Sequence, residues 1–248
     1  MIQESGINLV DHLEELRRRL IISAAAIATA SIFSFFSSDF LIQIMTSPIK
    51  QSVQSLYFLS PYEAFLVRLK ISFVSGIVLS SPVLFAQLWR FVSPGLYASE
   101  RQILLPLILI STCLFLVGIS FAYFLVVPFA LKFFLGFQTF TLIPLISIGS
   151  YISFFLSLIL VFGVVFDLPV ILVGLISLKV VGTSFLSAQR KVIVILVFLL
   201  AAILTPTVDV FTQVFLALPL WLLFEISLWI GKGIEARRKP VDSGTGSI

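Results

Sequence analysis

Cysteine and histidine are both nearly absent from this 248-residue sequence. Cys113 is the single cysteine, which excludes a disulfide within the chain and a cysteine-based metal site. His12 is the single histidine, and it is expected on a helix surface because no second histidine exists to share a metal. The sequence also contains no catalytic triad and no phosphate-binding loop. These absences predict a protein that is not an enzyme and carries no cofactor.

Charged residues are also scarce, and their scarcity indicates the class of protein. Only 11% of the residues are charged, against about 25% in a soluble domain, while 59% are hydrophobic. The mean hydropathy is +1.16, and phenylalanine alone occurs 26 times. This composition predicts that lipid is the solvent for most of the chain. The segment after Met1 is polar, so no cleavable signal peptide is expected.

Long apolar runs divide the chain into spans. A helix that crosses a membrane needs about 20 mainly apolar residues. Six segments approach or meet this need, at residues 20–37, 65–89, 104–128, 151–176, 191–205 and 212–230. The expected fold class is therefore an all-α integral membrane protein with six transmembrane helices within residues 1–231.

The fifth of these segments is unusually short. Its apolar run from Val192 to Leu204 rises only about 20 Å as a helix, whereas a hydrocarbon core is about 30 Å thick. Either the bilayer thins around this span, or its ends are buried against neighbouring helices.

The placement of lysine and arginine predicts the orientation of the spans. With the N-terminus in the cytoplasm, the outside segments hold only Lys50, Arg68, Lys70 and Lys132 of the 16 basic residues. The other twelve lie inside, which predicts that both termini are cytoplasmic. Residues 232–248 are polar and are expected to form a flexible cytoplasmic tail.

The first outer segment, residues 38–64, alternates apolar and polar residues and contains two prolines. It is expected to form a short amphipathic element at the membrane interface. Ser60-Pro61 predicts a turn before the second span.

Residues 8–20 have the pattern of an amphipathic N-terminal helix, with one stripe formed by Leu9, Leu13, Leu16 and Leu20. Glu14 and Glu15 each precede an arginine, Arg18 or Arg19, by four residues. Such pairs can form ion pairs within the helix, worth about 0.2–0.5 kcal/mol each. The alternative is that a carboxylate here serves a cationic partner.

The segment between the second and third spans contains another carboxylate. Pro94-Gly95 forces a turn, and Glu100 is then suited to the N-terminus of the next helix. Capping alone would explain Glu100. However, Glu15 and Glu100 both lie beside apolar residues on segments expected in the cytoplasm. A short peptide with adjacent arginines and a following apolar stretch would need such carboxylates, because guanidinium pairs bidentately with them and lysine does not.

Acidic and amide residues also occur within or beside the later spans. Asp167 lies well inside the fourth span, followed by Pro169, which is expected to kink the helix. An intramembrane carboxylate is a functional candidate, and a structural hydrogen bond to a neighbouring span is the alternative. Glu225 is expected near the cytoplasmic end of the last span. Asp209 and Gln213 can cap that span or contact another helix.

Four segments, "HLEELRRRL", "SPYEAF", "FVSPGLYASER" and "LTPTVDVFTQ…LALP", resemble motifs of the TatC family. This family is the multi-spanning core subunit of the twin-arginine, Sec-independent translocase. The resemblance runs from Val10 to Leu228 and implies a concave bundle of six spans with both termini inside. It implies a proton-motive-force-driven receptor for the twin-arginine signal peptides of folded cargo, in a bacterial plasma (inner) membrane or a thylakoid.

The resemblance also implies partners and site residues. The partners are single-span Tat subunits of the TatA/TatB type, with a homo-oligomer inside a hetero-complex, and no nucleic acid. The implied signal-peptide residues are Glu15, Arg17, Phe91, Pro94, Leu96, Glu100 and Arg101. The other implied positions are Pro48, Asp167, Asp209 and Gln213. The family often has Glu at the position of Asp167, and its commonest turn, "TPPD", is one residue shorter than "TPTVD" here.

Two other functions compete with this interpretation. One is a proton-coupled secondary transporter of a small solute that uses Asp167. The absence of an internal repeat argues against it. The other is a passive scaffold, in which Glu15 and Glu100 affect only stability.

Overall fold

The computed structural model describes residues 9–50, 55–92, 104–136, 145–177, 181–204 and 210–238. Among these residues, helices account for all regular structure apart from one isolated bridge between Tyr57 and Ser147. The chain forms two compact units, residues 1–163 and 164–248, and each is described by itself.

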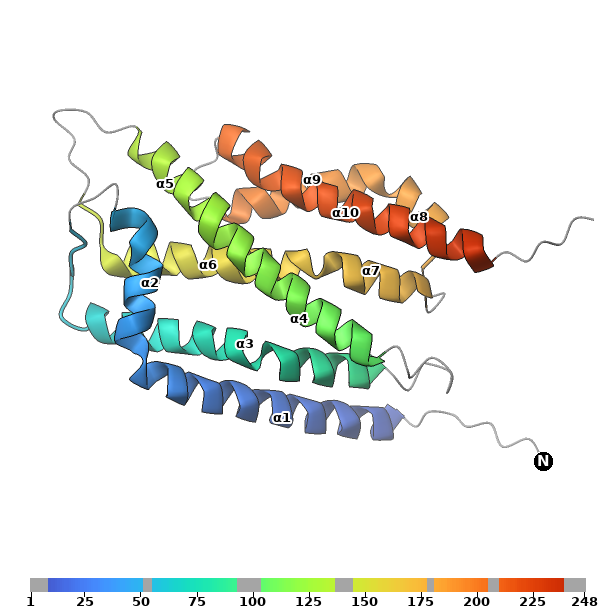
Figure 1. Ribbon diagram of the computed structural model, residues 1–248, viewed down its shortest axis with the longest axis horizontal. Coiled ribbons are helices and arrows are strands. Elements are labelled where there is room, and N and C mark those ends of the chain that lie inside the picture. The colour runs from blue at the N-terminus through green and yellow to red at the C-terminus, as the bar shows by residue number, and fades with distance from the viewer. Residues whose placement is uncertain are drawn as a thin grey trace, which may run out of the picture. The chain divides into compact units, whose positions relative to one another are not determined.

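The first unit holds most of the helices (Figure 1). They are α1 (Leu9–Phe36), α2 (Ser38–Lys50), α3 (Glu63–Val92), α4 (Leu104–Phe121), the π-helix η3 (Ala122–Val126), α5 (Val127–Leu135) and α6 (Ile148–Phe166), whose end enters the second unit. The second unit contains α7 (Leu168–Ser177), α8 (Thr183–Ala188), α9 (Arg190–Leu204) and α10 (Val210–Arg238).

Five stretches of helix in the described residues are long and apolar enough to cross a membrane: Leu13–Phe36, Glu63–Phe91, Leu105–Leu135, Ile148–Ser177 and Gln213–Ala236. They correspond to five of the six expected spans. Helix α9 corresponds to the remaining one, but its 15 residues rise only about 22 Å. The sixth crossing therefore stays a prediction, as does the orientation of the termini.

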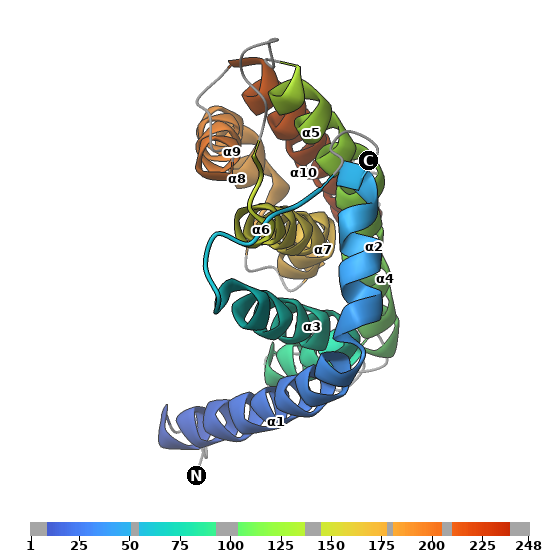
Figure 2. The same cartoon turned by 90° about the vertical axis from the view of Figure 1, so that its left-hand side faces the viewer.

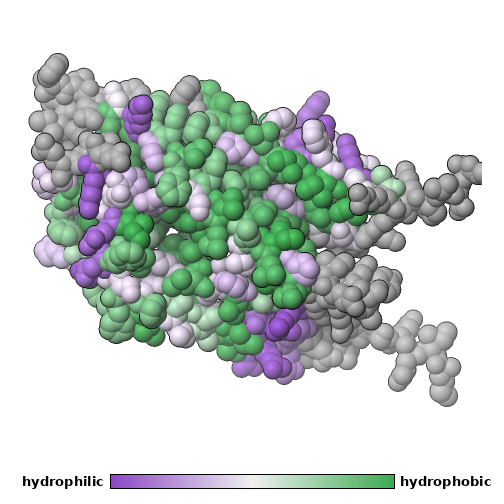
Figure 3. All heavy atoms as spheres, in the orientation of Figure 1, coloured by the Kyte–Doolittle hydropathy of each residue, from purple (hydrophilic) through white to green (hydrophobic). Residues whose placement is uncertain are grey.

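Helix α1 combines two elements that the sequence analysis treats as separate. The expected amphipathic helix and the first span form one uninterrupted helix from Leu9 to Phe36. Large apolar side chains such as Phe33 and Phe36 are 69% and 84% exposed. Figure 3 shows a mostly apolar surface with a strongly hydrophilic group at the N-terminal end of α1. Apolar exposure of this kind fits a helix whose solvent is lipid.

Helices α1 and α3 form the most extensive helix pair of the first unit. Both views show them side by side along their length (Figure 1 and Figure 2). The two backbones approach closely because Gly76 on α3 faces Ser31 on α1. A Cβ at position 76 would stand only 2.8 Å from the Ser31 nitrogen and 2.9 Å from its Cα. Small residues at such contacts let membrane helices pack backbone to backbone.

The segment after α1 folds as a short helix, α2, which confirms the expected short element. Pro61 then forms the expected turn before α3, with the Glu63 N–H donating to the Ser60 carbonyl at 3.1 Å. The Glu63 carboxylate accepts from the backbone N–H of Leu59 at 2.6 Å and of Gly149 at 2.7 Å, and from the Ser147 hydroxyl. This one side chain, from the "SPYEAF" segment, ties the start of α3 to the start of α6.

The second unit is organised around α10, which packs against α7, α8 and α9. Its core contains Ile176, Leu186, Phe224 and Leu228. Two carboxylates of α10 add polar ties: Glu225 pairs with Arg190 at 2.5 Å, and Glu235 accepts from the Thr183 N–H at 2.9 Å. Glu225 is thus paired and largely buried rather than simply exposed at a helix end.

The last helix is longer than the sequence suggests. Helix α10 continues to Arg238, beyond residue 232, where the flexible tail is expected to begin. The bonds from Glu235 to the N–H and hydroxyl of Thr183 hold this extension against α8. Residues 239–248 lie outside the described residues.

A test of the α1–α3 contact is the substitution Gly76→Ala. Its methyl group would press on the Ser31 backbone, so the protein should lose about 1–3 kcal/mol of unfolding free energy. Gly233→Ala on α10 is the matched control, because a Cβ there meets nothing within 4 Å. Unfolding of both variants in detergent is compared with the parent chain. Equal stability of the two variants would contradict the close α1–α3 contact.

Candidate functional site

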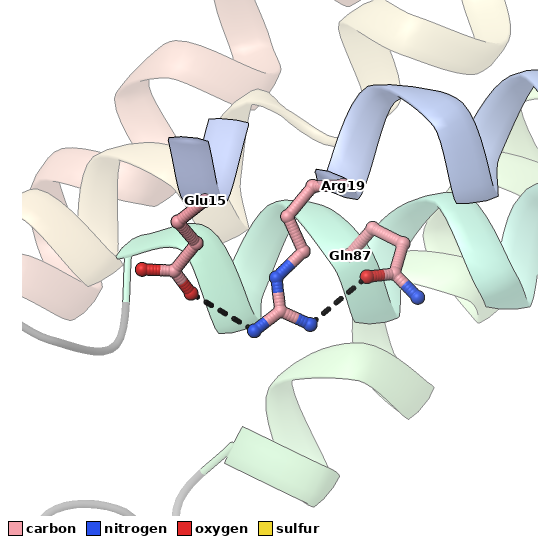
Figure 4. A network of polar contacts seen from close by, with 3 residues as sticks. All are labelled: Glu15, Arg19 and Gln87. Carbon is pink, nitrogen blue, oxygen red and sulfur yellow. Dashed lines mark hydrogen bonds and ion pairs between the residues drawn. The ribbon is translucent and has the colours of Figure 1, made fainter. Parts of the chain in front are cut away.

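The N-terminal part of α1 carries a polar network that reaches α3 (Figure 4). The Arg19 guanidinium donates to the Glu15 carboxylate at 2.9 Å and to the Gln87 side-chain carbonyl at 3.0 Å. Glu15 and Arg19 are one helical turn apart, so the pair forms within α1, as its spacing predicts. The bond from Arg19 to Gln87 joins α1 to α3, and the spacing of residues in the sequence does not predict it.

The environment of this network is intermediate between water and core. The side chains of Glu15 and Arg19 are 29% and 25% exposed. Glu14, Arg17 and Arg18 on the same helix are exposed. Leu13 and Leu20, also exposed, add apolar surface beside the charges. The site therefore offers a carboxylate that already binds a guanidinium, next to uncovered leucines.

The other implied signal-peptide residues are only partly described. Phe91 lies in the last turn of α3 and is half-buried, four residues after Gln87 and therefore on the same face of the helix. The remaining four, Pro94, Leu96, Glu100 and Arg101, lie outside the described residues. The proximity of Glu100 to Glu15 thus stays a prediction.

Asp167 lies at an interruption of the expected fourth span. The side chain is buried, with 3% exposure. Helix α6 ends at Phe166 and α7 begins at Leu168, because Pro169 has no N–H to donate to the carbonyl of Val165. The backbone carbonyl of Asp167 instead accepts from Val170 at 3.0 Å and Ile171 at 3.1 Å. The structure confirms the interruption expected from Pro169.

Gln213 contacts another helix rather than serving as a cap. Its side-chain amide donates to the backbone carbonyl of Phe198 at 2.8 Å, which joins α10 to α9. Asp209, the acidic position implied beside it, lies outside the described residues. The sequence allows Gln213 either to cap the last span or to contact another helix, and the structure shows the contact.

Pro48 lies inside α2, where it has no N–H for the carbonyl of Ile44 four residues before it. The Tyr123 hydroxyl donates to that carbonyl at 3.0 Å. The Tyr151 hydroxyl donates to the next carbonyl, Met45, at 2.6 Å. Two tyrosines, one from η3 and one from α6, therefore donate to backbone carbonyls of α2. One of these carbonyls, that of Ile44, lacks its usual helical donor because Pro48 has no N–H.

Sequence reasoning did not select Arg19, Gln87, Tyr123 and Tyr151 as members of these arrangements. Arg19 appeared only as a partner in a helical ion pair. A proline within an amphipathic segment signals a carbonyl that needs a donor. The sequence does not say which distant side chain supplies it.

We expect the bond from Tyr123 to depend on Pro48. Tyr123→Phe should cost about 1 kcal/mol of unfolding free energy, because the Ile44 carbonyl loses its donor. In a Pro48→Ala background the new N–H of residue 48 can bond to Ile44, so the same change should cost less. A double-mutant cycle of unfolding in detergent measures this difference.

Tyr151→Phe serves as the control, since its acceptor, Met45, does not depend on residue 48. Its cost should be the same in both backgrounds. An equal cost of Tyr123→Phe in both backgrounds would show that Pro48 does not create the acceptor.

Comparison with known proteins agrees with the motifs. Residues 11–219 match the family described as Sec-independent protein translocase protein (TatC). The chain is 43% identical over 233 residues to TatC of Magnetococcus marinus, covering 93% of this chain and 86% of that protein. It is 40% identical over 236 residues to TatC of Carboxydothermus hydrogenoformans, covering 95% and 97%.

A crystal structure of the twin arginine translocase receptor TatC in DDM superposes on the chain with a TM-score of 0.83. The two are 42% identical, and the match covers 89% of this chain and 99% of that one. On these matches, the chain belongs to the TatC family of Sec-independent protein translocase proteins.

Proposed function

We propose that this protein is the receptor of the translocase for twin-arginine signal peptides, with the Glu15 carboxylate as the group that takes one of the two arginines. The observation that carries the proposal is the guanidinium already bound there, from Arg19 at 2.9 Å. A carboxylate that holds an arginine of its own chain has the geometry and exposure to hold an arginine of another.

The surroundings of Glu15 suit the rest of such a peptide. A signal peptide continues from its arginines into an apolar stretch, and Leu13 and Leu20 are 59% and 60% exposed beside the carboxylate. Guanidinium binds a carboxylate through two parallel N–H bonds, which an ammonium group cannot reproduce. Arginine should therefore be preferred to lysine at this position.

The second arginine is assigned to Glu100. Phe91 supports this assignment, because it lies one helical turn from Gln87 at the end of α3. Helix α3 therefore ends little more than one turn beyond the Glu15 network, and the segment that contains Pro94, Leu96, Glu100 and Arg101 follows it in the sequence. Arg17, exposed on α1, completes the proposed surface.

The remaining implied positions are assigned to assembly. Asp167 would position a polar residue of a single-span partner of the TatA/TatB type. Asp209, Gln213 and Pro48 are assigned to partner or intramembrane contacts of their own. The proposal includes six spans with both termini in the cytoplasm of a bacterial inner membrane. It also includes oligomers within a hetero-complex, and the proton-motive force as the energy source.

The receptor proposal is tested with a labelled twin-arginine signal peptide and a twin-lysine version, using the full chain purified in detergent. Glu15→Gln should weaken arginine-peptide binding about tenfold or more, because a hydrogen bond to a charged group is worth about 1.5–3 kcal/mol. The same substitution should largely remove the preference for arginine over lysine.

Glu14→Gln is the matched control, since it removes a neighbouring carboxylate that is exposed on the same helix. It should change binding by less than about threefold, as surface charges do. Equal binding of the two peptides by the parent chain, or equal losses in Glu15→Gln and Glu14→Gln, would refute the assignment.

Asp167 provides a separate test of the assembly role. Asp167→Asn keeps the size of the side chain but replaces its carboxyl group with an amide, so export of twin-arginine cargo should fall about threefold or more while peptide binding in detergent is unchanged. Asp167→Glu, which has the residue frequent in the family, should export normally. A loss of peptide binding in Asp167→Asn would contradict this role, and abolished uptake of a proton-coupled solute would favour the transporter alternative.

A further inference from the structure

The proposed arginine-binding carboxylate is already occupied in the structure. Arg19 donates to Glu15 at 2.9 Å, and the other terminal nitrogen of its guanidinium donates to Gln87 at 3.0 Å (Figure 4). A signal peptide cannot pair with this face of Glu15 while Arg19 remains in place. Binding therefore includes an exchange of one guanidinium for another.

We propose that Arg19 is a built-in competitor, which masks Glu15 in the free protein and is displaced by an arginine of the incoming signal peptide. The inference rests on the proposed function, because it concerns how the same carboxylate becomes available to its ligand. Arg19 then acts through Glu15 and lowers the affinity of the free site for a cationic ligand.

The exchange costs every cationic ligand the same amount, because Arg19 must leave Glu15 before either an arginine or a lysine can bind there. An incoming arginine restores the charge-assisted bond that Arg19 gives up, whereas a lysine presents a compact ammonium group with a different geometry. The preference for arginine therefore comes from Glu15, and the masking lowers the affinity of the site as a whole.

Gln87 can keep its hydrogen bond to Arg19 after Arg19 leaves Glu15. Its side-chain carbonyl bonds to the nitrogen of Arg19 that does not contact Glu15, so this bond can persist when the Glu15 bond breaks. Arg19 is 25% exposed, which also lets its freed nitrogen reach water. Displacement therefore leaves each terminal nitrogen of Arg19 with a partner or with access to water.

Arg19 differs in this respect from its neighbours. Arg17 and Arg18 are exposed, and the described part of the chain offers neither an ion pair. Only Arg19 lies one turn from Glu15 and also contacts α3. The simpler alternative is that the network only fastens α1 to α3. Those helices already contact at Gly76 and Ser31, about three turns further along α1.

The test measures binding of the twin-arginine and twin-lysine peptides to the full chain in detergent. Arg19→Gln removes the competitor and keeps an amide that can bond to Gln87. It should tighten binding of the arginine peptide about two- to fivefold, the range of an exposed ion pair. It should tighten binding of the lysine peptide by the same factor, so that the ratio of the two affinities stays as in the parent chain.

Arg18→Gln is the control for charge. It removes one positive charge next to Arg19 but leaves Glu15 masked, so it should tighten binding of both peptides less than Arg19→Gln does. The double variant Glu15→Gln/Arg19→Gln should bind no better than Glu15→Gln alone, because unmasking has no effect without the carboxylate. Melting in detergent confirms that each variant is folded.

Weaker or unchanged arginine-peptide binding in folded Arg19→Gln would overturn the masking proposal. If that variant does not fold, Arg19→Lys replaces it. Lysine keeps the charge and is a weaker competitor, so a smaller gain is expected, and no gain overturns the proposal. The receptor function fails separately, when the parent chain shows no arginine preference or Glu15→Gln has no effect on binding.

Discussion

In lipid a backbone carbonyl or N–H has no water to bond with, so each one must find a partner within the protein. Two prolines of the described helices leave a carbonyl without its usual helical partner. Pro48 has no N–H for Ile44, and the Tyr123 hydroxyl takes that carbonyl at 3.0 Å. Near Pro169 the helix is interrupted, and the carbonyl of Asp167 opens the next one. The breaks that proline imposes thus become fixed points at which distant helices meet or a polar side chain is placed.

Charged side chains of the described helices also pair with one another, and the pairs differ in whether they join two helices or lie within one. Arg68 pairs with Asp39 at 2.6 Å and Arg190 with Glu225 at 2.5 Å, and each of these pairs joins two helices. The pair of Arg19 and Glu15 lies within one helix, so its opening separates no two elements. Arg19 keeps its contact with α3 through Gln87 when the pair opens. The pair can therefore open while α1 and α3 stay joined.

The sequence predicted what depends on local pattern and missed what depends on how helices align. Hydropathy placed five membrane-length helices, Pro61 and Pro169 marked a turn and a break, and four-residue spacing gave the pair of Glu15 and Arg19. The contact of Arg19 with Gln87 joins residues far apart in the chain. Its existence depends on the relative rotation and shift of α1 and α3, which the close approach at Gly76 helps to fix. A single sequence carries no direct record of that alignment.

Selectivity for arginine needs more than charge, because lysine is attracted to the same carboxylate. Glu15 distinguishes the two by the geometry of their hydrogen bonds. A resident guanidinium on that carboxylate lowers the affinity for both by the same factor, so it determines how tightly the site binds rather than which residue it prefers. Under the proposed function, the basic residues of α1 therefore do more than orient the first span. The cluster that looks redundant in the sequence, with carboxylates beside arginines, is what allows one arginine to be exchanged for another.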